Sequence, residues 1–71
     1  MSTINYKELD ELCRASIEDY DEKVSIAWGY MDRMRCPLSM AFPELYDEIV
    51  GVLEDNEIDW EELDIEEIIS V

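Results

Sequence analysis

Histidine is absent from this 71-residue chain, and basic residues are scarce, with five Lys and Arg against 20 Asp and Glu. Without imidazole, the commonest general base and a common neutral metal ligand are missing, which excludes His-dependent catalysis and His-containing zinc sites. The net charge of −15 repels nucleic-acid phosphates and anionic membrane surfaces. We therefore expect neither direct nucleic-acid binding nor membrane binding.

Cysteine and long apolar runs are also scarce. Cys13 and Cys36 are too few for a disulfide framework. The longest uncharged stretches, 24–31 and 36–43, are far shorter than the roughly 20 residues that a membrane span needs. The chain reaches Glu8 without a continuous apolar region, so no secretory signal peptide is predicted. We expect a cytoplasmic protein.

The apolar residues that are present, 48% of the chain, are enough for one core, and we expect a single domain over residues 1–71. Their spacing is helical from the start. Asn5 is a predicted N-cap, with Glu8 three residues later as in a capping box. The apolar stripe of this first helix comprises Leu9, Leu12, Cys13, Ser16, Ile17 and Tyr20.

A second helix is predicted between a cap at Asp21 and a stop at Cys36 and Pro37, because the residue before a proline disfavours helical geometry. Gly29 in its middle costs about 1 kcal/mol of helix propensity relative to Ala, which predicts a closely packed neighbour. The stripe is wide, so we expect this helix to be the most buried. It comprises Val24, Ala27, Trp28, Met31 and either Met34 or Arg35, widened by Ile26 and Tyr30.

A third helix begins after a tight turn near Ser39, with Pro43 in its first turn, where the missing N–H is not needed. It is predicted to stop at Asp55 and Asn56, with Asn56 in the left-handed conformation. Its stripe comprises Phe42, Leu45, Tyr46, Ile49, Val52 and Leu53.

A final segment is predicted to start at Asp59, with Glu62 at the capping-box position, and to break at Asp64. No run of alternating polar and β-branched residues is long enough for a strand. The predicted fold is all-α: a small single-domain bundle of three helices plus a short C-terminal helical segment.

Charge is unevenly distributed along the chain. Residues 1–35 hold all five bases and eight acids, whereas residues 36–71 hold twelve acids and no base. Nine of those twelve lie between Glu54 and Glu67, interleaved with large apolar residues such as Trp60. Such interleaving is typical of a folded acidic surface and not of a solvated tail.

The acidic segment also resembles the second half of an EF-hand calcium loop. With Glu62 as the last ligand, the first and third ligand positions fall on Gly51 and Leu53, which have no side-chain oxygen. A loop that starts at Asp55 instead places Trp60 where the sharp turn needs glycine. Calcium needs six to eight converging oxygens, so we predict no metal site.

Catalysis is not predicted either. The serines have neither a histidine nor an evident lysine base. Size, acidity and helical content are similar to those of phosphopantetheine carrier proteins, but Ser39 follows Leu38 and not the aspartate of the modified motif. We expect no catalytic residue and no cofactor.

The leading hypothesis is a non-enzymatic interaction protein that docks its acidic C-terminal half on a basic protein surface. In its sharper form, the chain inhibits a nucleic-acid-binding enzyme by mimicking nucleic-acid charge, since helical carboxylates four residues apart lie about 6 Å from each other. Small phage inhibitors, such as anti-CRISPR and anti-restriction proteins, are similar in size and charge only, and would act in the host cytoplasm. The predicted partner-binding residues are Glu54, Asp55, Glu57, Asp59, Trp60, Glu61, Glu62, Asp64, Glu66 and Glu67.

The alternative hypothesis is a structural adaptor or self-associating helical module, including a homodimer, whose apolar residues form the interface while the acids give solubility. Added salt distinguishes the two hypotheses. A charge-driven complex weakens steeply with salt, whereas an apolar interface changes little.

Overall fold

The computed structural model describes residues 5–70, and in this range it contains helices and no strand. The predicted all-α class is therefore confirmed. There are three longer helices, with a short helix between the second and the third, and a 3-10 turn connects the third to a short C-terminal helix. The elements are α1 (Tyr6–Ser16), α2 (Tyr20–Met34), α3 (Leu38–Ala41), α4 (Pro43–Asp55), η1 (Trp60–Glu62, 3-10) and α5 (Ile65–Ser70).

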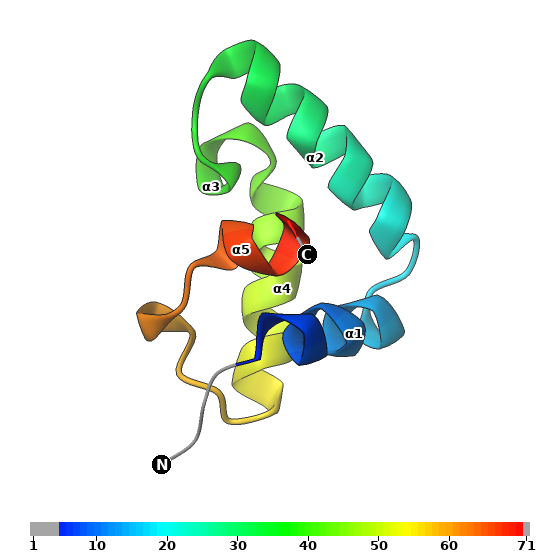
Figure 1. Ribbon diagram of the computed structural model, residues 1–71, viewed down its shortest axis with the longest axis vertical. Helices are drawn as coiled ribbons and strands as arrows, with labels where there is room; N and C mark the ends of the chain where they lie inside the picture. The colour runs from blue at the N-terminus through cyan, green and yellow to red at the C-terminus, as the bar shows by residue number, and fades with distance from the viewer. Residues whose placement is uncertain (1–4, 71) are drawn as a thin grey trace.

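Helix α4 runs through the middle of the molecule, which measures 38 × 23 × 18 Å (Figure 1). Helix α1 packs against α4 and α5, and α3 packs against α2 and α4. Helix α2 lies at the upper right of the view, whereas η1 lies at the lower left, on the other side of α4 (Figure 1). The first and last described helices are thus in contact.

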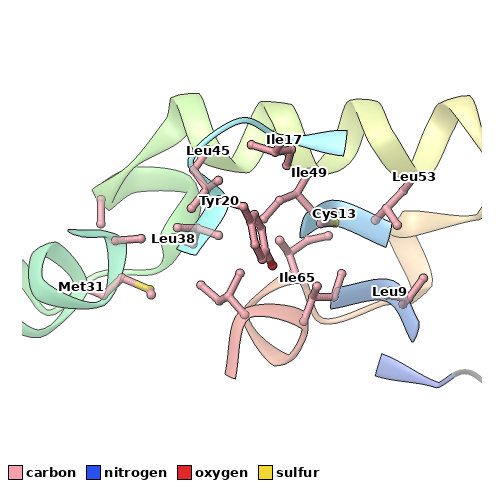
Figure 2. Close-up of a cluster of buried hydrophobic side chains, with 14 residues drawn as sticks. Leu9, Cys13, Ile17, Tyr20, Met31, Leu38, Leu45, Ile49, Leu53 and Ile65 are labelled. Carbon is pink, nitrogen blue, oxygen red and sulfur yellow. The ribbon is translucent and has the colours of Figure 1, made fainter. Parts of the chain in front are cut away.

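The core is a single cluster to which every α-helix contributes (Figure 2). The predicted spacing in α4 places Leu45, Ile49 and Leu53 on one fully buried face, at intervals of four residues. The ring of Tyr20 lies in the middle of the cluster (Figure 2). The buried apolar residues are Leu9, Cys13, Ile17, Tyr20, Ala27, Met31, Leu38, Ala41, Leu45, Ile49, Leu53, Ile65, Ile68 and Ile69.

The connection between α1 and α2 differs from the prediction. Asn5 caps α1 as expected, with its side chain accepting a hydrogen bond of 3.0 Å from the Lys7 backbone N–H. However, α2 begins at Tyr20, and Asp19 precedes it in the left-handed conformation with φ of 56°. Asp21, the predicted cap, therefore lies inside α2. The turn reverses the chain so that both Ile17 and Tyr20 enter the core.

Helix α2 was expected to be the most buried helix, and this prediction is wrong. Helices α1, α3 and α4 pack against α2, but of its residues they bury only Tyr20, Ala27 and Met31, so the wide stripe is only partly covered. Gly29 also lacks the expected close neighbour, since a Cβ added there would meet no atom within 4 Å among the described residues. The exposed apolar residues of α2 are Ile26, Trp28 and Tyr30 at 40% exposure each and Met34 at 56%.

The proline positions are confirmed as boundaries. Helix α2 ends at Met34, and Arg35 follows in the left-handed conformation, its N–H bonded to the Met31 carbonyl at 2.8 Å. Pro37 then precedes α3, so that the expected turn near Ser39 is a short helix. Pro43 occupies the first turn of α4, as predicted.

Candidate protein-binding surface

The acidic segment, residues 54–67, begins at the C-terminal end of α4. The left-handed residue that ends this helix was predicted one position too early. Asn56 has φ of −100°, and the left-handed residue is Glu57, with φ of 57°. The Ile58 N–H bonds to the Leu53 carbonyl at 2.9 Å, and the Glu57 N–H bonds to the Glu54 carbonyl at 3.0 Å. This is the Schellman pattern, which requires the left-handed residue one position beyond the cap.

After this turn, Trp60 connects the acidic segment to the core and to the end of α4. Its ring is half-buried against the core, and its indole N–H donates to Glu54 Oε2 at 3.3 Å. The expected capping box of Asp59 and Glu62 is absent, because the Asp59 side chain makes no cap hydrogen bond. Residues Trp60–Glu62 form the single 3-10 turn η1 instead. Trp60 thereby holds the acidic turn against the end of α4.

The predicted break at Asp64 is confirmed, and Asp64 itself starts the last helix. Its Oδ1 accepts a hydrogen bond of 3.1 Å from the Glu66 backbone N–H, as an N-cap aspartate does. The Asp64 backbone N–H donates to the Tyr6 hydroxyl at 3.3 Å. This contact ties the acidic segment to α1.

The acids from Glu54 to Glu67 form what we call the acidic surface. It runs from the end of α4 through η1 to α5 (Figure 1). Eight of these nine side chains are exposed, and Glu66 is half-buried. None of them forms an ion pair with a Lys or Arg among residues 5–70. The fold thus leaves this surface strongly negative. Its acids are Glu54, Asp55, Glu57, Asp59, Glu61, Glu62, Asp64, Glu66 and Glu67.

Part of the acidic surface is concave. An open groove of about 440 Å³ is bordered by Glu62, Asp64 and Glu66 on one side and by Tyr46 of α4 on another. Three carboxylates and one aromatic ring around a groove are suited to a lysine or arginine side chain, which combines a cationic end with an apolar stem. Ser39, Leu63 and Ile65 complete the lining.

Two of the five basic residues form ion pairs among the described residues, and both do so away from the acidic surface. Arg14 bonds to Asp10 at 2.9 Å and to Asp21 at 2.7 Å, and Lys23 bonds to Glu48 at 3.1 Å. All three ion pairs involve bases of α1 and α2, so they do not reduce the charge of the acidic surface.

A second polar cluster lies at the core boundary near α1. Asp10 is only 6% exposed, and its partner Arg14 is exposed. Burial, followed by the charge of Asp10, raises the pKa of the Cys13 thiol to about 11, so this thiol is protonated near neutral pH. Burial also raises the pKa of Tyr20, whose hydroxyl has no partner in hydrogen-bonding geometry although Asp10 is near. The cluster offers neither a thiolate nucleophile nor an accessible acid.

The described residues contain neither a metal-binding cluster nor a helix that could span a membrane. Among residues 5–70, no group of three or more His, Cys, Asp or Glu side chains is placed to hold a metal ion. None of the described helices has the length and apolar content required to cross a bilayer.

The exposed apolar side of α2 is the feature that sequence reasoning missed. Ile26, Tyr30 and Met34 follow one another at intervals of four residues, and Trp28 lies on another side of the helix. The sequence signal for this exposed side was the width of the apolar stripe of α2, which is too broad for one neighbouring helix to cover. Trp28 borders an open groove of about 470 Å³ together with Met31, Asp32, Arg35, Cys36, Pro37 and Glu66.

Comparisons of the chain with protein-family models, curated proteins and solved structures find no match. Functional inference therefore depends on the surfaces described above.

Proposed function

We propose that this chain is a small non-enzymatic interaction protein that docks its acidic surface on a basic surface of another protein. The observation that supports the proposal is the exposure of eight of nine acids between Glu54 and Glu67, without a basic partner among the described residues. Clustered like charges destabilise a compact domain by mutual repulsion. A positively charged partner would relieve that cost on binding.

The structure of the segment also favours a preformed binding surface. The Schellman cap, the Trp60–Glu54 hydrogen bond and the Asp64 cap each hold part of it in place. A surface that is ordered before binding loses less conformational entropy on association. The groove beside Glu62, Asp64 and Glu66 would receive a lysine or arginine side chain of the partner.

In the sharper form of the proposal, the partner is a nucleic-acid-binding enzyme and the acidic surface takes the place of nucleic acid in its groove. Duplex DNA carries about one charge per 1.7 Å of helix axis, so a DNA-binding groove is a strongly positive surface. A protein of net charge −15 that competes for such a groove would act as an inhibitor.

The proposal is tested with two variants of equal charge. One neutralises four acids of the acidic surface that make no side-chain hydrogen bond among residues 5–70 (Asp55→Asn, Asp59→Asn, Glu61→Gln, Glu62→Gln). The control neutralises four exposed acids elsewhere (Glu11→Gln, Glu18→Gln, Asp32→Asn, Asp47→Asn). Binding of each to a panel of purified basic nucleases and DNA-binding proteins is measured by calorimetry at several salt concentrations.

We expect the wild type to bind at least one of these proteins, with an affinity that falls as salt rises and that a short DNA duplex competes away. The surface variant should lose far more affinity than the control variant, because only its charges face the partner. Equal losses in the two variants, or an affinity that salt does not change, would contradict the proposal.

A further inference from the structure

One face of α2 is exposed, and no ion pair connects it to another element among residues 5–70. Glu22, Ile26, Gly29 and Arg33 follow one another at intervals of four, three and four residues, the spacing that aligns side chains along one seam of a helix. All four residues are exposed, and so is Tyr30 beside them. We call these five residues the α2 seam.

Gly29 lies in the middle of the α2 seam, and no packing contact among residues 5–70 requires a glycine there. It is helical, its φ is not positive, and a side chain there would enter open space. Glycine at such a position costs about 1 kcal/mol of helix stability relative to Ala. Glycine does, however, let a second helix approach closely, because no Cβ stands between the two backbones.

The charges of the α2 seam are self-complementary when two copies run antiparallel. Glu22 lies near the N-terminal end of α2 and Arg33 near its C-terminal end, about 16 Å apart along the axis. Neither forms an ion pair among the described residues. In an antiparallel pair, Glu22 of each copy faces the partner's Arg33, and Ile26 of each copy faces the partner's Gly29.

We infer that the chain forms a two-fold symmetric homodimer through the α2 seam, with the two α2 helices antiparallel and crossing near Gly29. Each Ile26 side chain fills the space that the partner's Gly29 leaves open. One Glu22–Arg33 ion pair between the two copies forms at each end of the contact. The ring of Tyr30, held edge-on against Phe42 with ring centres 5.8 Å apart, borders the contact as a fixed aromatic group.

A second copy fits this face better than an unrelated partner does. A partner chosen for basic charge would be attracted by Glu22 and repelled by Arg33, whereas an antiparallel copy satisfies both. The α2 seam also shares no residue with the acidic surface: η1 lies across α4 from α2 (Figure 1), and Glu66 meets α2 only at the groove beside Trp28, on another side of that helix. The inference is thus independent of the proposed function.

The dimer responds to salt in the opposite sense to the proposed docking. Two chains of net charge −15 repel each other, and this repulsion exceeds the attraction of two surface ion pairs. Added salt screens the repulsion, so it strengthens the dimer while it weakens docking on a basic protein.

The test is sedimentation equilibrium of the full chain between about 1 μM and about 1 mM, the range in which small interfaces associate. We expect a concentration-dependent rise from the monomer mass of 8.4 kDa toward twice that value, and a larger dimer fraction at higher salt. At a salt concentration that screens the overall repulsion, Arg33→Glu should weaken dimerisation by about tenfold or more, because both pairs become like-charged. Glu22→Arg should also weaken dimerisation for the same reason, although this variant makes each chain less negative. The double variant Glu22→Arg/Arg33→Glu should restore it.

Arg35→Glu is the matched control, because it makes the same change of charge off the seam and should leave the dimer nearly intact. Gly29→Leu should abolish the dimer while the monomer keeps its helical circular dichroism. A chain that stays monomeric at every concentration and salt overturns the inference. So does a dimer that Arg33→Glu and Arg35→Glu weaken equally, or one that the double variant does not restore.

Discussion

The indole N–H of Trp28 donates a hydrogen bond of 3.1 Å to the backbone carbonyl of Ile69, 41 residues later in the chain. The carbonyl belongs to the last turn of α5, where carbonyl groups lack partners within the helix. One side chain of α2 thereby caps the C-terminal helix. The six residues of α5 could not form a stable helix alone.

Trp28→Phe is therefore expected to lower the free energy of unfolding by about 1 kcal/mol, the typical net contribution of one hydrogen bond. The ring of Phe retains most of the packing, so the loss reports mainly the hydrogen bond. Urea denaturation followed by circular dichroism measures it. An unchanged midpoint would show that the Ile69 carbonyl is equally well satisfied by water.

Gly29→Ala is expected to raise the free energy of unfolding of the monomer by about 1 kcal/mol. The added methyl group enters open space, and the unfolded chain loses conformational freedom. The measurement is made at low micromolar concentration, where the monomer prevails. Gly51→Ala in α4 is a comparison, since a Cβ there also meets no atom within 4 Å. A loss of stability in Gly29→Ala would contradict the open environment of this position.

Arg14→Met is expected to lower the melting temperature more than Lys23→Met does. Arg14 pairs with the buried Asp10, whose carboxylate would be left without its partner, whereas the Lys23 partner Glu48 is exposed and can be solvated. Differential scanning calorimetry of the two variants compares the losses directly. Equal losses would mean that water reaches the Asp10 carboxylate in the variant.

Tyr20→Phe is expected to leave the free energy of unfolding unchanged or to raise it by up to about 1 kcal/mol. The Tyr20 hydroxyl is buried and has no hydrogen-bond partner among residues 5–70. Removing it therefore removes the free-energy cost of burying an unpaired polar group in the folded state. Tyr6→Phe is the contrasting variant. It removes the hydroxyl that accepts from the Asp64 N–H, and should be destabilising. Urea denaturation of both variants at neutral pH gives the comparison.

Alkaline pH is expected to destabilise the protein through Cys13 and Tyr20. Burial raises the pKa of both groups, so the folded state holds their protons more tightly than the unfolded state does. For Cys13 this stabilisation is complete below pH 9 and is lost as pH rises from 9 to about 11. Urea midpoints over that window should fall, and Cys13→Ala should reduce the slope. A constant midpoint would show that neither proton is retained by folding.

Local patterns allowed several features to be predicted from the sequence. The four-residue spacing of Leu45, Ile49 and Leu53 identified the buried face of α4, because residues three or four apart lie on the same side of a helix. Pro43 and Asp64 marked helix boundaries through their own backbone preferences and capping chemistry. These effects involve residues within one turn of each other.

Two errors in the acidic half concern positions where contacts with other residues decide the backbone conformation. Asn56 was a reasonable left-handed residue by type, but the hydrogen bond from Ile58 to Leu53 places that conformation at Glu57. Asp59 was a reasonable cap by pattern, but Trp60 packs against the core and bonds to Glu54, so the segment forms a 3-10 turn.

The amino-acid sequence by itself determined the helical class, the helix boundaries marked by Pro37 and Pro43, and an acidic C-terminal half too crowded to be neutralised by five bases. Only the tertiary structure decided that the acids between Glu54 and Glu67 face solvent together and that one apolar side of α2 stays uncovered. The spacing of apolar residues sets which side chains share a helix face. Whether that face is covered depends on where the distant helices α1, α3 and α4 come to lie, and local spacing carries no information about their positions.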